Sequence, residues 1–227
     1  MNVITLASRK GGSGKSTLTA HLAAYAHKLG KRSLILDADP QGSLTLWHSM
    51  RAGREPRLES AARGIDRLLA YAMIDGVEWV FIDTAPTMWV VVQEAIRAAT
   101  LVVVPARPGF FDLAAVAETV KIARERQKPY AVVINAAPVK RDEKESPAVA
   151  ASRAKLDALG IPVWSGQISQ RAGYMASLAA GFSAGEVAPD SAAGQEVARL
   201  WSAIERSVAA IRGAQTDAAV MHGRAAA

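Results

Sequence analysis

Short runs of apolar residues alternate along the chain with longer stretches in which apolar residues recur every three or four positions. The short runs predict strands at residues 3–7, 33–37, 79–83, 100–105, 130–135 and 161–165. The longer stretches predict helices at about residues 15–29, 43–51, 60–73, 90–98, 113–126 and 147–159. Several of the strands are continuous apolar runs, as expected when helices cover both faces of a parallel sheet. The pattern therefore predicts an α/β fold with a doubly wound, mostly parallel sheet and helices on both faces.

The C-terminal third is mostly helical in pattern. Its last apolar stripe predicts an amphipathic helix packed on the core and comprises Val197, Leu200, Trp201, Ile204, Val208 and Ile211. After Arg212 the sequence is rich in alanine and has no apolar stripe, so residues 213–227 are predicted to form a disordered tail. No repeat or long linker divides the remainder, and its length suits one α/β unit. We therefore predict a single domain over residues 1–212.

Composition narrows the possible classes of protein. The chain has no cysteine, which excludes disulfides, thiolate metal sites and iron–sulfur clusters. Its longest apolar runs are far shorter than the roughly 20 residues that a membrane-spanning helix needs. Strand-like sequence begins at Asn2, which leaves no room for a signal peptide, so a cytoplasmic protein is expected. The formal net charge of +6 is compatible with a polyanionic partner and equally with a well-solvated surface.

A glycine-rich segment between the first predicted strand and the first predicted helix carries the strongest chemical signal. It reads Lys10-Gly11-Gly12-Ser13-Gly14-Lys15-Ser16-Thr17. Glycines allow backbone N–H groups to point at phosphate oxygens, and the start of the helix adds its positive dipole end. In such a P-loop the lysine, here Lys15, reaches the β- and γ-phosphates, and the hydroxyl of Ser16 ligates Mg²⁺. A flexible turn with an incidental Lys-Ser pair is disfavoured by the flanking strand and helix. The segment predicts a site for ATP and Mg²⁺.

This segment departs from the general P-loop pattern because Arg9 stands where the first glycine belongs. With Lys10 it resembles the deviant Walker A box of the ParA/MinD family of ATPases. Two further segments resemble the family's switch I and its Walker B strand with switch II: Asp37-Ala38-Asp39-Pro40-Gln41-Gly42 and Phe81-Ile82-Asp83-Thr84-Ala85-Pro86. The resemblance covers about residues 1–205, with specific motifs in the first 90. Within the family the chain is most similar to the short ParA proteins of plasmid partition, which lack an N-terminal helix-turn-helix domain.

The resemblance implies a role for several residues beyond the P-loop. Lys10 matches the lysine that contacts phosphates in the partner's site of an ATP-bound sandwich dimer. Asp39 matches the aspartate that orients the attacking water, and Asp83 matches the Walker B aspartate that binds Mg²⁺ directly or through water. Asp37 either helps to arrange Mg²⁺ and water or is a turn residue. Asn135 matches an adenine contact, although an asparagine that closes a strand is often only a turn former.

By the same resemblance, the chain is expected to be an ATPase that forms a homodimer on ATP and binds DNA without sequence preference. A ParB-like centromere-binding or adaptor protein would stimulate hydrolysis, and the cycle would position plasmid, chromosomal or protein cargo on the nucleoid. Candidate DNA contacts are the basic residues Lys140, Arg141, Lys144, Arg153, Arg171, Arg199, Arg206 and Arg212. Two alternatives are a MinD-like membrane-cycling ATPase and another P-loop metabolic ATPase. The membrane alternative needs a lysine-rich amphipathic C-terminal helix, which residues 213–227 lack in their pattern.

Overall fold

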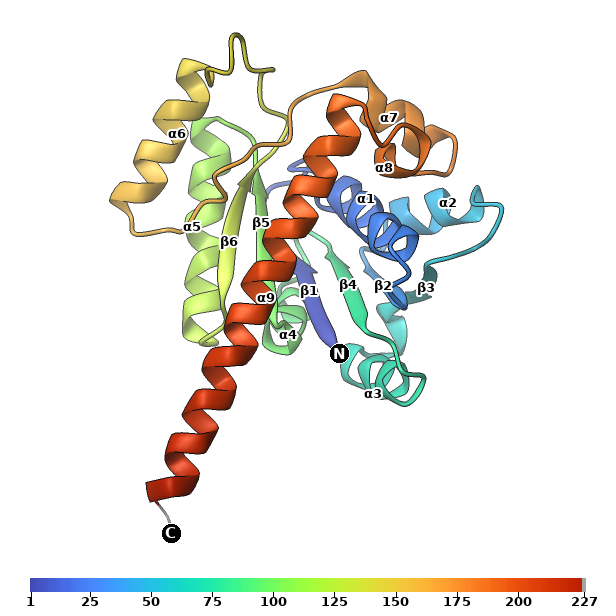
Figure 1. Ribbon diagram of the computed structural model, residues 1–227, viewed down its shortest axis with the longest axis vertical. Helices are drawn as coiled ribbons and strands as arrows, with labels where there is room; N and C mark the ends of the chain where they lie inside the picture. The colour runs from blue at the N-terminus through green and yellow to red at the C-terminus, as the bar shows by residue number, and fades with distance from the viewer. Residues whose placement is uncertain (226–227) are drawn as a thin grey trace.

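The computed structural model describes the backbone of residues 1–225 and, apart from Phe111, the side chains of residues 1–217. Its centre is one six-stranded sheet in the order β3-β2-β4-β1-β5-β6, in which every neighbouring pair is parallel (Figure 1). The strands are β1 (Asn2–Leu6), β2 (Ser33–Ala38), β3 (Arg57–Ser60), β4 (Trp79–Thr84), β5 (Leu101–Ala106) and β6 (Tyr130–Ile134). The predicted α/β fold class is confirmed.

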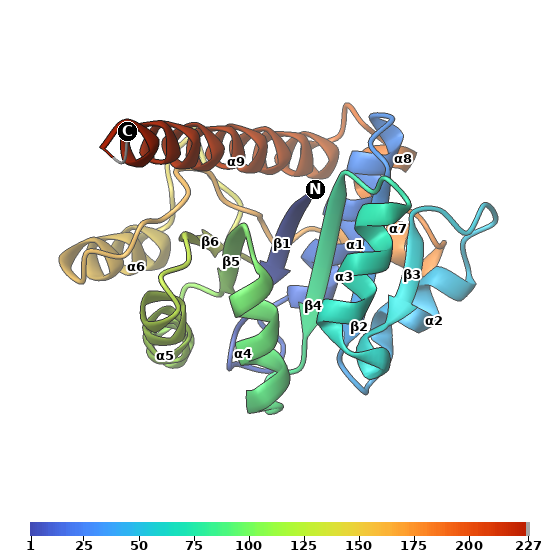
Figure 2. The same cartoon turned by 90° about the horizontal axis from the view of Figure 1, so that it is seen from below.

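Helices cover both faces of this sheet (Figure 2). One face packs against α1 (Lys15–Lys28) and α9 (Ala192–Ala225), beside which lie α2 (Ser43–Ser49), α7 (Ala172–Ala179) and α8 (Ala184–Val187). The other face packs against α3 (Ile65–Ile74), α4 (Trp89–Ala98) and α5 (Phe110–Glu125), with α6 (Pro147–Ala158) beside α5. Successive residues of a strand point to opposite faces, so Val3 joins the core under α3 while Ile4 joins the core under α1 and α9.

The strand predicted at residues 161–165 is not part of the sheet. Residues 161–165 form only an isolated bridge, at Val163 with Val132. Pro162 has no N–H to donate to a neighbouring strand. The guanidinium of Arg153 donates hydrogen bonds to the carbonyls of Trp164, Ser165 and Gly166, so these carbonyls do not pair with β6 and the strand ladder does not extend. The prediction of a strand there was wrong.

The strand missed by the sequence prediction is β3, which pairs with β2 at the edge of the sheet. Its four residues are exposed or only partly buried, so they show no apolar run. Ser60 ends this strand and accepts a hydrogen bond from the N–H of Ala62, at the start of the 3₁₀ turn η1 (Ala61–Arg63). The predicted helix over residues 60–73 therefore begins later, as α3 at Ile65.

The last helix is longer than the apolar stripe predicts. Helix α9 begins at Ala192 and continues to Ala225, beyond Arg212, where the sequence predicts the end of the ordered domain. Residues 226–227 of the predicted disordered tail lie outside the described residues. Among the described residues, none of the helices is both long enough and apolar enough to span a bilayer.

Candidate functional site

The glycine-rich segment lies at the carboxyl end of β1, between its neighbours β4 and β5, and leads into α1. It lines a cavity of about 880 Å³ together with residues that follow β2, β5 and β6. Gly14 stands immediately before α1 with φ of 98°, a conformation that L side chains rarely adopt. Because parallel strands place their carboxyl ends at one edge, residues far apart in the sequence meet in this cavity.

Lys15 is buried in the loop that it follows. Its Nζ donates to the carbonyl oxygens of Ser8, at 3.2 Å, and of Lys10, at 3.3 Å. Burial lowers the pKa of Lys15, while the charges of Asp83 and Asp39 act in the opposite direction. The ammonium is therefore fixed over the first half of the loop, where it is available to an anion in the cavity.

Ser16 and Asp83 form the centre of the candidate metal site. The Ser16 hydroxyl donates to Oδ2 of Asp83 at 2.6 Å, although the two residues are 67 positions apart. Asp83 Oδ1 is fully buried, and no hydrogen-bond partner for it exists among the described residues. Burial raises the pKa of Asp83 to about 7, against the lowering effects of the Ser16 hydrogen bond and the Lys15 charge. Such an orphaned carboxylate oxygen fits a hard cation.

Mg²⁺ suits this set of donors. The ion is usually held by one or two protein oxygen ligands together with waters and phosphates, and it does not need a cage of side chains. No group of three or more carboxylates and imidazoles converges as a metal site within the part of the chain that the structure describes. Ser16 and Asp83 would hold the ion beside the loop, and the ion would neutralise charge on bound phosphates.

The two predicted switch I aspartates lie in different surroundings. Oδ2 of Asp37 accepts from Thr45, at 3.2 Å from the backbone N and 2.9 Å from the hydroxyl, and Oδ1 accepts from Asp39 N–H at 3.2 Å. Asp37 thus stabilises the turn that leads into α2. These contacts fit the interpretation of Asp37 as a turn residue. Asp39 lines the cavity, and its Oδ1 accepts a hydrogen bond from Gln41 N–H at 3.0 Å. Asp39 is the better placed of the two to face a bound nucleotide.

Asn135 comes into contact with the P-loop itself. Its Nδ2 donates to the carbonyl of Ser13 at 2.7 Å, and a Cβ on Gly14 would lie 2.0 Å from the same nitrogen. This side chain therefore braces the loop, and it also lines the cavity. Lys10 is exposed at the start of the loop, and its backbone N–H donates to the Ser8 hydroxyl at 3.3 Å. An adenine contact for Asn135 and a partner contact for Lys10 stay predictions.

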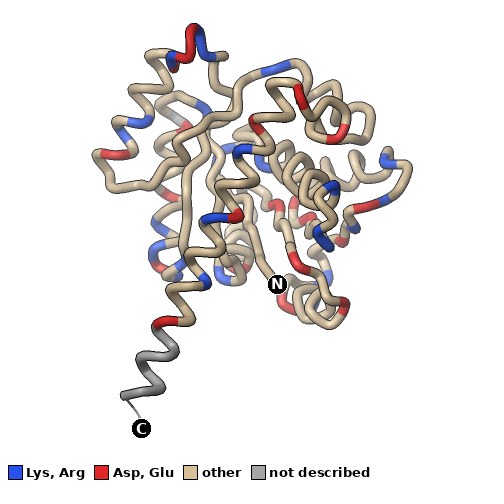
Figure 3. Tube along the Cα trace, viewed as in Figure 1, with Lys and Arg blue, Asp and Glu red and all other residues tan. Residues whose placement is uncertain are grey.

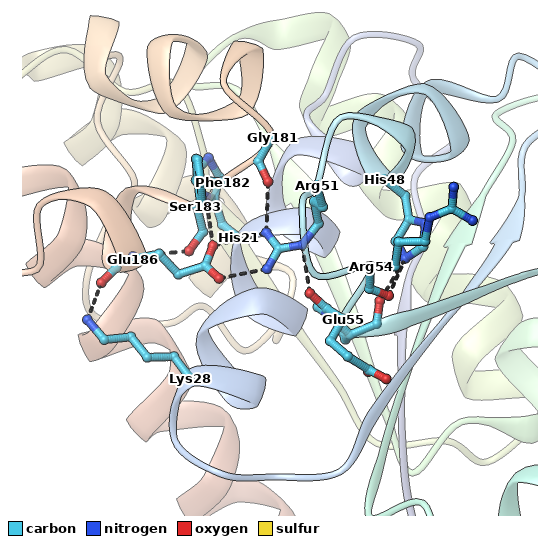
Figure 4. A network of polar contacts seen from close by, with 12 residues as sticks. His21, Lys28, His48, Arg51, Arg54, Glu55, Gly181, Phe182, Ser183 and Glu186 are labelled. Atoms are coloured by element: carbon cyan, nitrogen blue, oxygen red, sulfur yellow. Dashed lines mark hydrogen bonds and ion pairs between the residues drawn. The ribbon is translucent and has the colours of Figure 1, made fainter.

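A polar network that the sequence did not predict joins α1, the segment after α2 and α8 (Figure 4). Arg51, next to the end of α2, forms a buried ion pair with Glu186 of α8 at 2.7 Å and donates to the carbonyls of Glu55 and Gly181. From α1, His21 accepts from Ala184 N–H at 3.1 Å and Lys28 donates to the Gly185 carbonyl at 2.6 Å. The P-loop helix, the helix after switch I and α8 are thereby joined. No local pattern in the sequence singles these residues out.

The chain is similar in sequence to a family of nucleotide-binding proteins. A family model described as the CobQ/CobB/MinD/ParA nucleotide binding domain matches residues 4–182. The chain is 34% identical over 145 residues to the chromosome-partitioning ATPase Soj of Thermus thermophilus, covering 50% of this chain and 58% of that protein. It is 35% identical over 120 residues to the maintenance of carboxysome distribution protein A of Gloeobacter kilaueensis, covering 52% and 55%. The chain thus spans little more than half the length of these curated relatives.

Solved structures share the fold at lower identity. The MinC:MinD cell division protein complex of Aquifex aeolicus matches with a TM-score of 0.71 and 18% identity, over 90% of this chain and 96% of that one. A complex of Cyanothece McdA with ATP matches with a TM-score of 0.68 and 18% identity, over 90% and 96%. These matches agree with the parallel sheet and its helices.

Proposed function

Because the chain belongs to the CobQ/CobB/MinD/ParA nucleotide-binding family, we propose that it is a ParA-like ATPase that positions plasmid, chromosomal or protein cargo. In this proposal it hydrolyses ATP with Mg²⁺, forms a sandwich dimer when ATP is bound and binds DNA without sequence preference in that state. It acts in the cytoplasm, on the nucleoid when ATP is bound. The curated relatives named for chromosome partitioning and carboxysome distribution support a positioning role.

The observation that carries the ATPase proposal is the arrangement around Asp83. Its buried, unpartnered Oδ1 and its bond to Ser16 lie beside the glycine loop that Lys15 closes. Phosphoryl transfer needs positioning and charge neutralisation more than covalent chemistry. In the proposal Lys15 binds the β- and γ-phosphates, the loop from Gly11 to Thr17 binds phosphate oxygens through its N–H groups, and Asp39 orients water.

The first test is nucleotide binding and turnover by Lys15→Ala. The variant removes the charge fixed over the loop, so ATP affinity or turnover is expected to be lost. Lys121→Ala is a matched control, because Lys121 is an exposed residue of α5 that lies outside the cavity and forms an ion pair with Glu125 of its own helix, at 4.0 Å. Turnover should also require Mg²⁺ and stop with a chelator. Turnover of Lys15→Ala at the wild-type rate would refute the ATPase assignment.

The dimer is tested through Lys10. If Lys10 contacts phosphates of the partner's nucleotide, Lys10→Ala should bind ATP nearly normally as a monomer and yet fail to dimerise. If Lys10 shapes only its own loop, the monomer itself should lose affinity. Sedimentation with ATP, together with a nucleotide titration, separates the two outcomes.

For DNA, the ion pairs of the basic residues, which are blue along the chain in Figure 3, bear on which candidates are available as contacts. Arg153 pairs with Glu145 at 3.0 Å, Arg171 pairs with Glu196 at 3.0 Å, and Lys140 lies 3.9 Å from Glu145. Glu196 thus neutralises Arg171, and Glu145 offsets one of the two charges of Lys140 and Arg153. Non-specific DNA binding depends on cations that replace the counterions of phosphates, so neutralised side chains contribute little.

Two other candidates share an open face of α9. Arg199 and Arg206 are exposed and two helical turns apart, opposite the stripe that contains Val197 and Trp201. Arg206 donates to Ser202 at 2.7 Å. No carboxylate pairs with either arginine among the described side chains. We propose that this face of α9 meets the phosphates of DNA in the ATP-bound dimer.

Gel retardation with ATP, ADP and no nucleotide, at several salt concentrations, tests this binding. The ATP-bound dimer should bind and the monomer should not, because dimerisation doubles the contacts while the association entropy is lost once. Equal DNA affinity with and without ATP would refute nucleotide-switched binding. A ParB-like partner, the remaining part of the proposal, is tested by stimulation of ATP turnover on addition of a candidate partner with DNA.

A further inference from the structure

Two arginines, Arg9 and Arg107, flank the P-loop, and they differ in whether a carboxylate pairs with the guanidinium. Arg9 forms an ion pair with Glu118 at 3.2 Å, and its guanidinium lies 4.6 Å from the centre of the Trp89 ring. Arg107 follows the carboxyl end of β5 and lines the nucleotide cavity. Among the side chains that the structure describes, no carboxylate lies within ion-pair distance of its guanidinium. Arg107 is therefore a cation at the cavity whose charge the fold leaves unmatched.

The position of Arg107 follows from the sheet. Strand β5 pairs with β1, and Ala7 N–H donates to the Val103 carbonyl at 3.1 Å, so the segment after β5 runs beside the loop after β1. Asp112 Oδ1 accepts from the backbone N–H of Arg107 at 3.2 Å and fixes the start of this segment. Nη2 of Arg107 consequently lies 3.9 Å from the point where a Cβ on Gly12 would stand.

Gly12 belongs to the half of the loop over which Lys15 lies. Lys15 Nζ donates to the carbonyls of Ser8 and Lys10, at the start of the loop. A P-loop lysine serves the β- and γ-phosphates, so the terminal phosphates belong at the Lys15 end. A guanidinium at the Lys15 end of the loop can donate two parallel N–H hydrogen bonds to two phosphate oxygens. A lysine ammonium lacks this planar pair of donors.

We propose that Arg107 is a phosphate-binding residue that contacts the terminal phosphate of a nucleotide bound in its own subunit. This inference rests on the proposed ATP binding. It assigns to the nucleotide site of its own subunit a second basic side chain, beside Lys15, that follows a different strand. Bound to the terminal phosphate, Arg107 selects the triphosphate over the diphosphate and ties the segment after β5 to the nucleotide state.

The test compares Arg107→Ala, Arg107→Lys and the wild-type chain in titrations with a non-hydrolysable ATP analogue and with ADP, each with Mg²⁺. The analogue should bind Arg107→Ala about 10- to 100-fold more weakly, as expected for a lost charge-assisted hydrogen bond, with ADP weakened much less. Arg107→Lys should recover only part of the loss, because it keeps the charge but not the planar pair of donors. Arg67→Ala is the matched control, because Arg67 is an exposed arginine of α3 that lies outside the cavity and contacts Tyr71 of its own helix.

The outcomes separate this inference from the proposal on which it rests. If the wild-type chain binds neither nucleotide, the ATPase proposal fails and the inference fails with it. If the wild-type chain binds both and Arg107→Ala binds both unchanged, only the role of Arg107 is refuted. An equal loss for the analogue and ADP would also refute it, because Arg107 would then only shape the loop. Thermal unfolding of each variant without nucleotide shows that the fold is kept.

Discussion

The contact between Gly14 and Asn135 predicts a measurable coupling within the P-loop. Gly14 has φ of 98° and ψ of 23°, and a Cβ there would stand 2.0 Å from Asn135 Nδ2. Gly14→Ala therefore has two separate costs. The backbone is strained by about 1–3 kcal/mol. The amide of Asn135, only 6% exposed, is also pushed off the Ser13 carbonyl, at about 1–3 kcal/mol for a buried polar group left without its partner.

A double-mutant cycle distinguishes these two costs. In wild type, Gly14→Ala should lower the free energy of unfolding by about 2–6 kcal/mol, the sum of both terms. In an Asn135→Ala background the clash is absent, so only the backbone strain remains. The coupling energy between the two positions should therefore be about 1–3 kcal/mol. Urea unfolding of the four proteins without nucleotide gives these values, provided that the m-value is unchanged.

Gly11→Ala is the control within the same loop. A Cβ on Gly11 meets no atom within 4 Å, so that substitution should change the free energy of unfolding by less than about 1 kcal/mol. Equal costs of Gly14→Ala in the two backgrounds would show that Asn135 does not brace the loop. A cost below about 1 kcal/mol in wild type would show that the loop adopts another conformation when no nucleotide is bound.

Three further predictions concern hydrolysis, pH and DNA. Asp39→Ala should bind ATP and hydrolyse it slowly, so that dimer accumulates in sedimentation; dissociation of the ATP-bound dimer at the wild-type rate would assign Asp39 another role. Burial lowers the pKa of His21 to about 4, so only the unfolded chain gains its proton between about pH 6.5 and 4. His21 should thus contribute a fall of roughly 3 kcal/mol in the free energy of unfolding as pH drops through that window, opposite in sign to the contribution of Asp83, whose raised pKa lets the folded chain gain a proton first. His21→Asn should remove the His21 part of the pH dependence in urea titrations; a pH dependence identical to wild type would refute the shift. Arg199→Glu with Arg206→Glu should flatten the dependence of log DNA affinity on log salt, by about 0.9 per lost phosphate contact, at unchanged basal ATP turnover; an unchanged slope would place the DNA on another face.

Local sequence was sufficient for the features that depend on neighbouring residues. The P-loop was predictable because its glycines, Lys15 and Ser16 lie within a few positions of one another, between a strand and a helix. Buried strands such as β4 and β5 were predictable because a strand covered on both faces must be apolar throughout. The edge strand β3 was not predictable, because its side chains are exposed or only partly buried and therefore form no continuous apolar run.

Only the tertiary structure determined which distant residues meet at the loop. Ser16 and Asp83 are 67 positions apart, and Asn135 and Ser13 are 122 apart, yet each pair is hydrogen-bonded. The strand order brings them together, because β4 lies beside β1, β6 lies one strand further on beyond β5, and the parallel strands end at the same edge. No sequence pattern pointed to Arg107. Its place above Gly12 depends on the parallel pairing of β5 with β1, a contact between residues about a hundred positions apart that no local pattern encodes.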